Sequence, residues 1–156
     1  MDGKFSYIAD IGEKTLVMVQ AFDAPRHAVF DAWTTAEEVT LWWDPTGLEL
    51  AVCEIDLRPN GAFRWVNQGD AGLNFQFAGI YCEIVRPERL VFEAAMGTSP
   101  RSMTTLNFAE TSHKTTLTMT IECPTVAQRD QMLAMRVDAG TARTLQNLAR
   151  RLERTQ

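Results

Sequence analysis

The chain has 156 residues, of which 46% are hydrophobic and 22% are charged, and its formal net charge is −5. This length and composition are those of one globular domain with a single core. The acidic balance argues against nucleic acid as a partner, and no apolar run approaches the ~20 residues of a membrane span.

The first third of the chain predicts one strand followed by two short helices. Residues 1–12 carry no clear pattern and are assigned to an N-terminal arm, whereas residues 13–23 have the apolar pattern of a strand. Pro25 suits the first turn of a helix, and a second helix runs into Trp42-Trp43 before Asp44-Pro45 ends it. Two short helices in succession make a compact corner and not the crossover of a parallel sheet.

Apolar runs separated by turn residues fill the middle of the chain. Strands are expected at residues 48–57, 62–67, 73–85, 90–96, 103–110 and 114–123. Consecutive strands with short turns form an antiparallel meander, and a long meander has to curl. The sequence therefore predicts one α+β domain over residues 13–153, with a curved antiparallel sheet of about seven strands.

The stretch Pro124–Glu153 is predicted as one long helix that covers the concave face of this sheet. Its C-terminal half carries an apolar stripe, formed by Leu145, Leu148, Ala149 and Leu152. Continued backwards, the same stripe holds small and polar residues, namely Ala127, Gln131, Ala134, Asp138 and Thr141. The opposite side carries arginines spaced by seven, namely Arg129, Arg136, Arg143 and Arg150. We expect the leucine-rich half to pack on the sheet and the other half to close over a cavity.

Local motifs add to this order of elements. They are Pro25-x3-Val29-Phe30-x2-Trp33, Trp42-Trp43-Asp44-Pro45, Asp56-Leu57-Arg58-Pro59-Asn60-Gly61, Gly79-Ile80-Tyr81-x-Glu83-Ile84-x2-Pro87-Glu88-Arg89-Leu90-Val91-Phe92, a threonine-rich strand at 114–123, and Gly140-x4-Leu145-x2-Leu148-x3-Leu152. Together they resemble the START-like (Bet v-like) helix-grip fold. Within it the chain is similar, over residues 13–153, to the bacterial homologues of the heat-shock ATPase activator, the AHSA1-like group of the SRPBCC superfamily.

The resemblance implies the fold and an internal cavity, but it implies no single reaction. Members include ligand carriers, cyclases, hydrolase-like proteins and the eukaryotic co-chaperone, and a shared fold does not fix function. Two positions depart from the family pattern. Asn60-Gly61 stands where Gly-Gly is common, and Thr141 stands where a large aromatic residue often follows the glycine of the last helix. The smaller Thr141 would enlarge the pocket under that helix or make it more polar.

The candidate cavity lining combines aromatic residues of the strands with small or polar residues of the helix. It consists of Trp42, Phe63, Trp65, Phe75, Phe77, Tyr81, Phe92, Met119, Ala134, Asp138 and Thr141. The alternative is that the aromatic residues simply fill the core and that Trp42-Trp43 belong to the corner of the short helices. Asp138 is either a pocket acid or base, with a pKa raised by burial, or a residue turned to solvent or paired with an arginine.

Positive signs of catalysis or of a bound metal are missing from the sequence. His27 and His113 are far apart, neither has a nucleophile placed near it, and no glycine-rich phosphate loop occurs. We therefore assign no catalytic residue, no metal and no cofactor. Cys53, Cys82 and Cys123 are expected to be reduced, buried packing residues of a cytoplasmic protein, since Met1–Asp10 lacks the pattern of a signal peptide.

Three functional hypotheses follow. The first is a protein that binds a small apolar or amphipathic molecule between sheet and helix. The second is a co-chaperone-like module that stimulates a heat-shock ATPase through an exposed patch such as the arginine side. Under either hypothesis the protein is expected to be a monomer or homodimer. The third is a hydrolase or cyclase that uses Asp138 or Glu83 as an acid or base.

Overall fold

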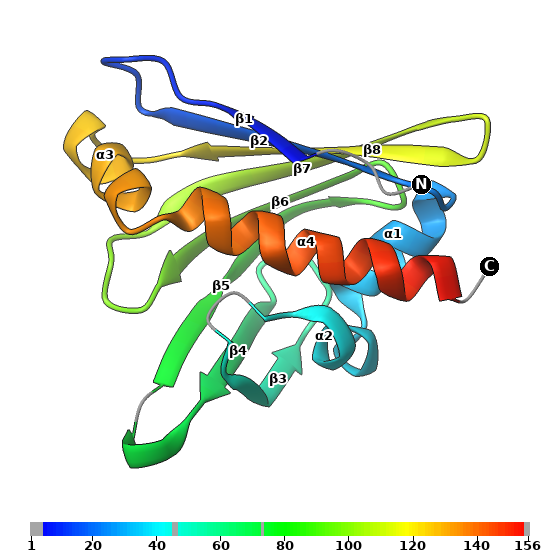
Figure 1. Ribbon diagram of the computed structural model, residues 1–156, viewed down its shortest axis with the longest axis horizontal. Coiled ribbons are helices and arrows are strands. Elements are labelled where there is room, and N and C mark those ends of the chain that lie inside the picture. The colour runs from blue at the N-terminus through cyan, green and yellow to red at the C-terminus, as the bar shows by residue number, and fades with distance from the viewer. Residues whose placement is uncertain (1–4, 45–46, 73, 155–156) are drawn as a thin grey trace.

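In the computed structural model, which describes residues 5–44, 47–72 and 74–154, one curved antiparallel sheet wraps around a long helix (Figure 1). The strands are β1 (Phe5–Ile8), β2 (Thr15–Phe22), β3 (Glu49–Ile55), β4 (Ala62–Gln68), β5 (Asn74–Val85), β6 (Arg89–Met96), β7 (Ser102–Thr111) and β8 (Lys114–Glu122). The helices are α1 (Arg26–Thr34), α2 (Ala36–Trp42), α3 (Val126–Ala134) and α4 (Val137–Arg154). Pro45 and Leu73, at which the sequence placed a helix end and a strand start, lie outside the described residues.

The sheet has eight strands in the order β1-β2-β8-β7-β6-β5-β4-β3, and every neighbouring pair is antiparallel. Helices α1 and α2 connect β2 to β3, which forms the opposite edge of the sheet. Strands β3 to β8 then follow one another as a meander, and the last of them, β8, pairs with β2. The antiparallel α+β architecture is thus confirmed. The eighth strand is β1, within the predicted arm, where it pairs at the edge with β2 and leaves most of its side chains exposed, so its sequence shows no alternation.

Helix α4 lies across the concave face of the sheet (Figure 1). Its predicted apolar stripe is buried, and no member is more than 4% exposed, namely Leu145, Leu148, Ala149 and Leu152. The stripe packs into one core with alternate residues of the strands, such as Leu16, Phe108 and Leu117. The prediction that the leucine-rich half grips the sheet is confirmed.

The predicted single helix over Pro124–Glu153 is wrong, because the chain breaks between α3 and α4. Met135 ends α3, and Arg136 has a φ of 59°, in the left-handed region that interrupts a helix. Neither residue is Gly or Pro, so the sequence carried no breaking signal at this point. The Thr125 side chain caps the start of α3 by accepting a hydrogen bond from the Gln128 N–H at 3.2 Å.

The break also shifts the rotational phase of the arginines, so they do not share one solvated side. Arg129 is only 2% exposed, and its Nη1 donates to the Thr15 carbonyl oxygen at 3.1 Å. This bond ties α3 to β2. Arg136, Arg143 and Arg150 remain exposed.

Four tryptophans form the corner where α1 and α2 meet the sheet. Trp33 and Trp42 have ring centroids 4.9 Å apart, as do Trp43 and Trp65. The Trp42 Nε1 donates to the Ala32 carbonyl oxygen, and the Trp43 Nε1 donates to the Asn67 Oδ1, each at 3.0 Å. These bonds fix Trp43 at the place where the corner meets α4.

Candidate ligand-binding cavity

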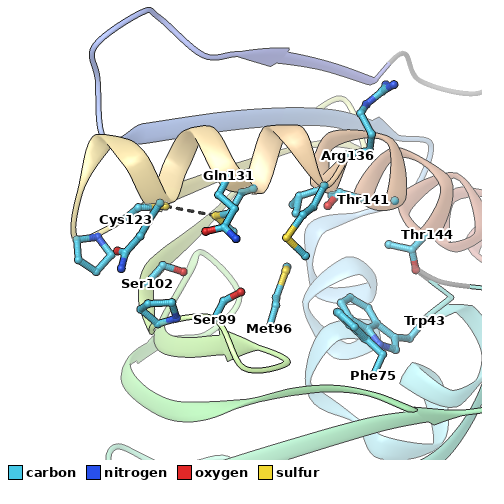
Figure 2. Close-up of a pocket in the computed structure, with 17 residues that line it drawn as sticks. Trp43, Phe75, Met96, Ser99, Ser102, Cys123, Gln131, Arg136, Thr141 and Thr144 are labelled. Atoms are coloured by element: carbon cyan, nitrogen blue, oxygen red, sulfur yellow. Dashed lines mark hydrogen bonds between the residues drawn. The ribbon is translucent and has the colours of Figure 1, made fainter. Parts of the chain in front are cut away.

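A cavity of about 260 Å³ lies between the α3–α4 pair and the end of the β6–β7 hairpin (Figure 2). Its walls come from four parts of the chain: α2's end, strands β5 to β7, the β8–α3 link, and the two C-terminal helices. The lining residues are Trp43, Phe75, Met96, Ser99, Pro100, Ser102, Cys123, Pro124, Gln128, Gln131, Met132, Met135, Arg136, Val137, Gly140, Thr141 and Thr144.

The cavity has a buried inner end and an exposed outer end. Trp43, Thr141 and Thr144 are buried at the inner end, whereas Gln131 and Met135 are exposed, Met135 at 62%. Beyond the inner end lies a smaller chamber of about 30 Å³. The residues that line both spaces are Trp43, Met96, Ser102, Met132, Thr141 and Thr144. The chamber is otherwise lined by Trp33, Phe77, Phe92, Ala94, Thr104, Met119 and Ile121.

Sulfur-bearing side chains form much of the cavity wall. Met96 comes from the sheet, and Met132 and Met135 come from α3 and its end. Unbranched thioether side chains adapt to guests of different shape. The Cys123 Sγ lies 3.3 Å from the Met132 Sδ, and burial raises the pKa of the Cys123 thiol, although Arg129 partly opposes this. Cys123 therefore remains a neutral packing group. Cys82, by contrast, is exposed and was wrongly expected to be buried, because its side chain points to the convex side of β5.

The cavity presents no charged group to a guest among its described lining residues. Arg136 is the one charged residue in the wall, but its guanidinium points away from Met96 and Ser99 (Figure 2). It pairs with the carboxylate of Asp138, with Nε and Oδ1 3.3 Å apart, and this bond raises the pKa of Arg136. The wall is therefore neutral and mostly apolar.

The structure places the predicted lining residues in several different environments. Phe75 and Thr141 line the cavity, and Phe77, Phe92, Met119 and again Thr141 line the inner chamber. Four aromatic residues are buried in the packed core beside these spaces without lining either of them, namely Trp42, Phe63, Trp65 and Tyr81. Ala134 is exposed on α3, and Asp138 is 6% exposed but lies outside both linings.

Sequence reasoning missed several residues of the wall. Trp43 lines the cavity, although Trp42 was the predicted one; the two are adjacent and point in different directions, so the pattern could not choose between them. Met132 and Met135 were missed because a continuous helix was assumed, and that assumption placed the wrong side of α3 toward the cavity. Met96 and Ser102 flank the β6–β7 turn, and the alternation of those two strands held the signal that they face inwards.

Two further classes of site find no support among the described residues. No group of three or more His, Cys, Asp or Glu side chains comes together there as a metal site. No helix in the described part of the chain has the length and apolar character needed to cross a membrane.

Comparison with known proteins assigns the chain to a family. The family model "Activator of Hsp90 ATPase homolog 1-like protein" matches residues 23–153. No curated protein matches the sequence.

Several solved structures share the fold at low sequence identity. A Rhodobacter sphaeroides protein is 19% identical, with 98% of this chain and 100% of that chain covered and a TM-score of 0.89. A Nitrosomonas europaea protein is 23% identical, with 96% and 99% covered and a TM-score of 0.81. A Staphylococcus epidermidis protein is 25% identical, with 94% of each chain covered and a TM-score of 0.80. These likenesses show that the START-like fold is common to all of them.

Proposed function

We propose a small-molecule-binding function for this chain, which belongs to the Activator of Hsp90 ATPase homolog 1-like family. The proposed guest is a small, largely apolar molecule that lies between the sheet and the α3–α4 pair. The observation that carries the proposal is the cavity of about 260 Å³ with a neutral wall rich in Met, Phe and Trp. Ligand pockets of about 300–1,000 Å³ are typical for drug-sized molecules, so this volume suits a smaller guest.

The energetics of the wall favour an apolar guest. Each Å² of apolar surface removed from water contributes about 25 cal/mol, so an apolar body gains from entering such a space. A charged group would lose its hydration there without an opposite charge to replace it, because Arg136 is turned outwards and bonded to Asp138. The three methionines would adjust their rotamers to the shape of the guest.

The test is ligand binding with and without space in the cavity. Native mass spectrometry and thermal shifts against a panel of lipids and aromatic metabolites should reveal binders of the wild-type protein. Thr141→Phe places a large ring at the inner end and should abolish binding while the protein stays folded. Gln146→Phe, on the exposed side of α4, is the matched control and should bind like the wild type. Equal binding by the Thr141→Phe variant would contradict the proposal.

A co-chaperone-like role is the second candidate, favoured by the description of the family and by the exposed arginines. The Arg136 and Arg143 side chains are 69% and 56% exposed. If they form a docking surface, the protein stimulates a heat-shock ATPase, and charge reversal at both positions removes the stimulation. The Thr141→Phe variant separates the two roles, because it should leave stimulation intact. A protein that gives no stimulation lacks this role.

The third hypothesis, acid–base catalysis, gains nothing from the structure. Glu83 is exposed on β5 and paired with Arg89, and Asp138 is bonded to Arg136 outside both linings. Neither carboxylate reaches the space that a guest would occupy.

A further inference from the structure

The thioether groups of the cavity wall differ in their exposure to solvent. Met135 lies where α3 ends, and it is 62% exposed. Met96 and Met132 also line the cavity, but they are partly buried against the core. Among the methionines that the structure describes, only Met135 is exposed, and it stands at the outer end of the wall. A reagent dissolved in water therefore reaches one sulfur of the site before the others.

A thioether reacts with a peroxide without assistance from other groups. The sulfur lone pair attacks one oxygen of hydrogen peroxide, an S–O bond forms as the O–O bond breaks, and the second oxygen leaves as water after taking the proton of the first. The sulfur is oxidised by two electrons, and the peroxide is reduced by two. The product, methionine sulfoxide, is a polar side chain in place of a flexible apolar one.

We propose that peroxide regulates this site: oxidation of the Met135 thioether to the sulfoxide lowers the affinity of the cavity for its apolar guest. This inference rests on the proposed small-molecule-binding function. The sulfoxide oxygen accepts hydrogen bonds from water, and an apolar guest that covers it would remove that water without offering a donor. A loss of roughly 40 Å² of apolar contact, at about 25 cal/mol per Å², corresponds to an affinity about fivefold lower.

The fourth sulfur of the wall, on Cys123, is protected from the same reagent. Cys123 is 3% exposed, and its Sγ donates to the Met132 Sδ at 3.3 Å (Figure 2). Peroxide oxidises the thiolate form of a cysteine, and burial raises the pKa of this thiol, so little thiolate is present at neutral pH. A thioether sulfur has no proton to lose. Oxidation of Met135 should therefore proceed at the same rate at pH 6.5 and at pH 8.

The test measures cumene binding before and after a limited treatment with hydrogen peroxide. Peptide mass spectrometry locates the added oxygen atom, calorimetry gives the affinity, and thermal denaturation reports the folding of the treated protein. When Met135 alone is oxidised, the affinity for cumene should fall about fivefold. The Tm should stay unchanged, because the side chain is exposed. Methionine sulfoxide reductase should then restore the affinity.

Three variants separate this effect from general oxidative damage. Met135→Leu keeps an apolar side chain of similar size that peroxide does not oxidise, so it should bind cumene like the wild type and keep its affinity after treatment. Met135→Gln places a polar group of similar length there and should bind about fivefold more weakly without any peroxide. Met103→Leu is the matched control, because Met103 is partly buried on β7 and lines neither the cavity nor the inner chamber. This control should remain as sensitive as the wild type.

The outcomes separate the redox inference from the proposed function. Unchanged cumene affinity in protein oxidised at Met135, or a Met135→Leu variant that still loses affinity in the same treatment, would overturn the inference and leave small-molecule binding in place. A loss that accompanies unfolding, or that follows oxidation of Cys123 and rises about tenfold per pH unit, would overturn it as well. Failure of cumene to bind the untreated wild type would also overturn the inference. Absence of any binder in the wider panel would overturn the binding function too.

Discussion

Replacing Thr144 with valine should destabilise the protein far more than the loss of one oxygen atom suggests. The Thr144 hydroxyl donates to the Trp42 carbonyl oxygen at 3.0 Å and accepts from the Asp44 N–H at 2.8 Å. The Trp42 carbonyl belongs to the last turn of α2, where the helix itself supplies no donor. One side chain of α4 therefore caps the end of another helix. Valine keeps the shape of Thr144 but has neither donor nor acceptor.

The size of the effect follows from these two partners. A buried polar group left without a partner costs about 1–3 kcal/mol, and the substitution orphans a carbonyl and an N–H at once. The Asp44 N–H is only partly buried, so we expect a total near 3 kcal/mol, toward the lower half of the combined range. For a domain of this length that corresponds to a fall in Tm of about 6–12 °C.

Urea denaturation of the wild type, Thr144→Val and Thr144→Ser measures this difference. Serine retains the hydroxyl and loses one methyl group, so it should cost about 1 kcal/mol. The ligand-binding assay adds a functional readout. Trp43 lies between Trp42 and Asp44 in the chain and lines the cavity, so the affinity for a bound small molecule should fall in the Thr144→Val variant. A valine variant as stable as the serine variant would refute the argument that this hydroxyl holds α2 to α4.

Four further outcomes are expected. Gly79→Ala should destabilise the protein by about 3 kcal/mol in the same urea assay, because the added Cβ would lie 2.1 Å from the Glu93 carbonyl oxygen of the adjacent strand; a stable variant would contradict this. Arg129→Met should cost about 2 kcal/mol, since the bonds to the Thr15 carbonyl oxygen and to the Asp130 carboxylate are lost while the aliphatic stem is kept; an unchanged midpoint would show that these bonds contribute nothing. Burial, with smaller contributions from nearby carboxylates, raises the pKa of the Cys53 thiol from 9.0 to about 11. Its alkylation by iodoacetamide should therefore rise about tenfold per pH unit between pH 8 and 10, with no plateau near pH 9, as followed by peptide mass spectrometry. Because the folded-state pKa is the higher one, the Cys53 contribution to stability should be fully present below pH 9 and be lost as the pH rises toward 11.

The fold was predictable because its main signals are repeated along many residues. Strand alternation, the turn motifs and the leucine stripe from Leu145 to Leu152 each draw on several side chains, so single exceptions did not change the result. The break at Arg136 depends on one residue in a left-handed conformation without Gly or Pro, and no periodic pattern records such an event. The edge strand β1 was missed for a related reason, because its side chains are mostly exposed on both faces and therefore show no alternation.

The cavity was predictable in kind but not in detail. Of the two stripe residues on α4, Thr141 lines the cavity, whereas Asp138 lies outside both linings. The α3 residues could not be placed, since the break uncouples their phase from that of α4. Neighbouring aromatic residues such as Trp42 and Trp43 are indistinguishable by composition, and the cavity lining shows that the Trp43 side chain is the one that reaches the space.

The break between α3 and α4 divides the cavity into a fixed part and an adaptable part. The inner end rests on α4, which the leucines and the Thr144 bonds hold against the core. The outer wall consists largely of flexible side chains on a nine-residue helix that is tied to β2 through Arg129. Under the proposed small-molecule-binding function, such a cavity would select its guest mainly at the fixed inner end and would tolerate variation in the part of the guest at the outer end. Members of one homologous series that share a head group should therefore compete for this protein with similar affinities, whatever the length of their tails.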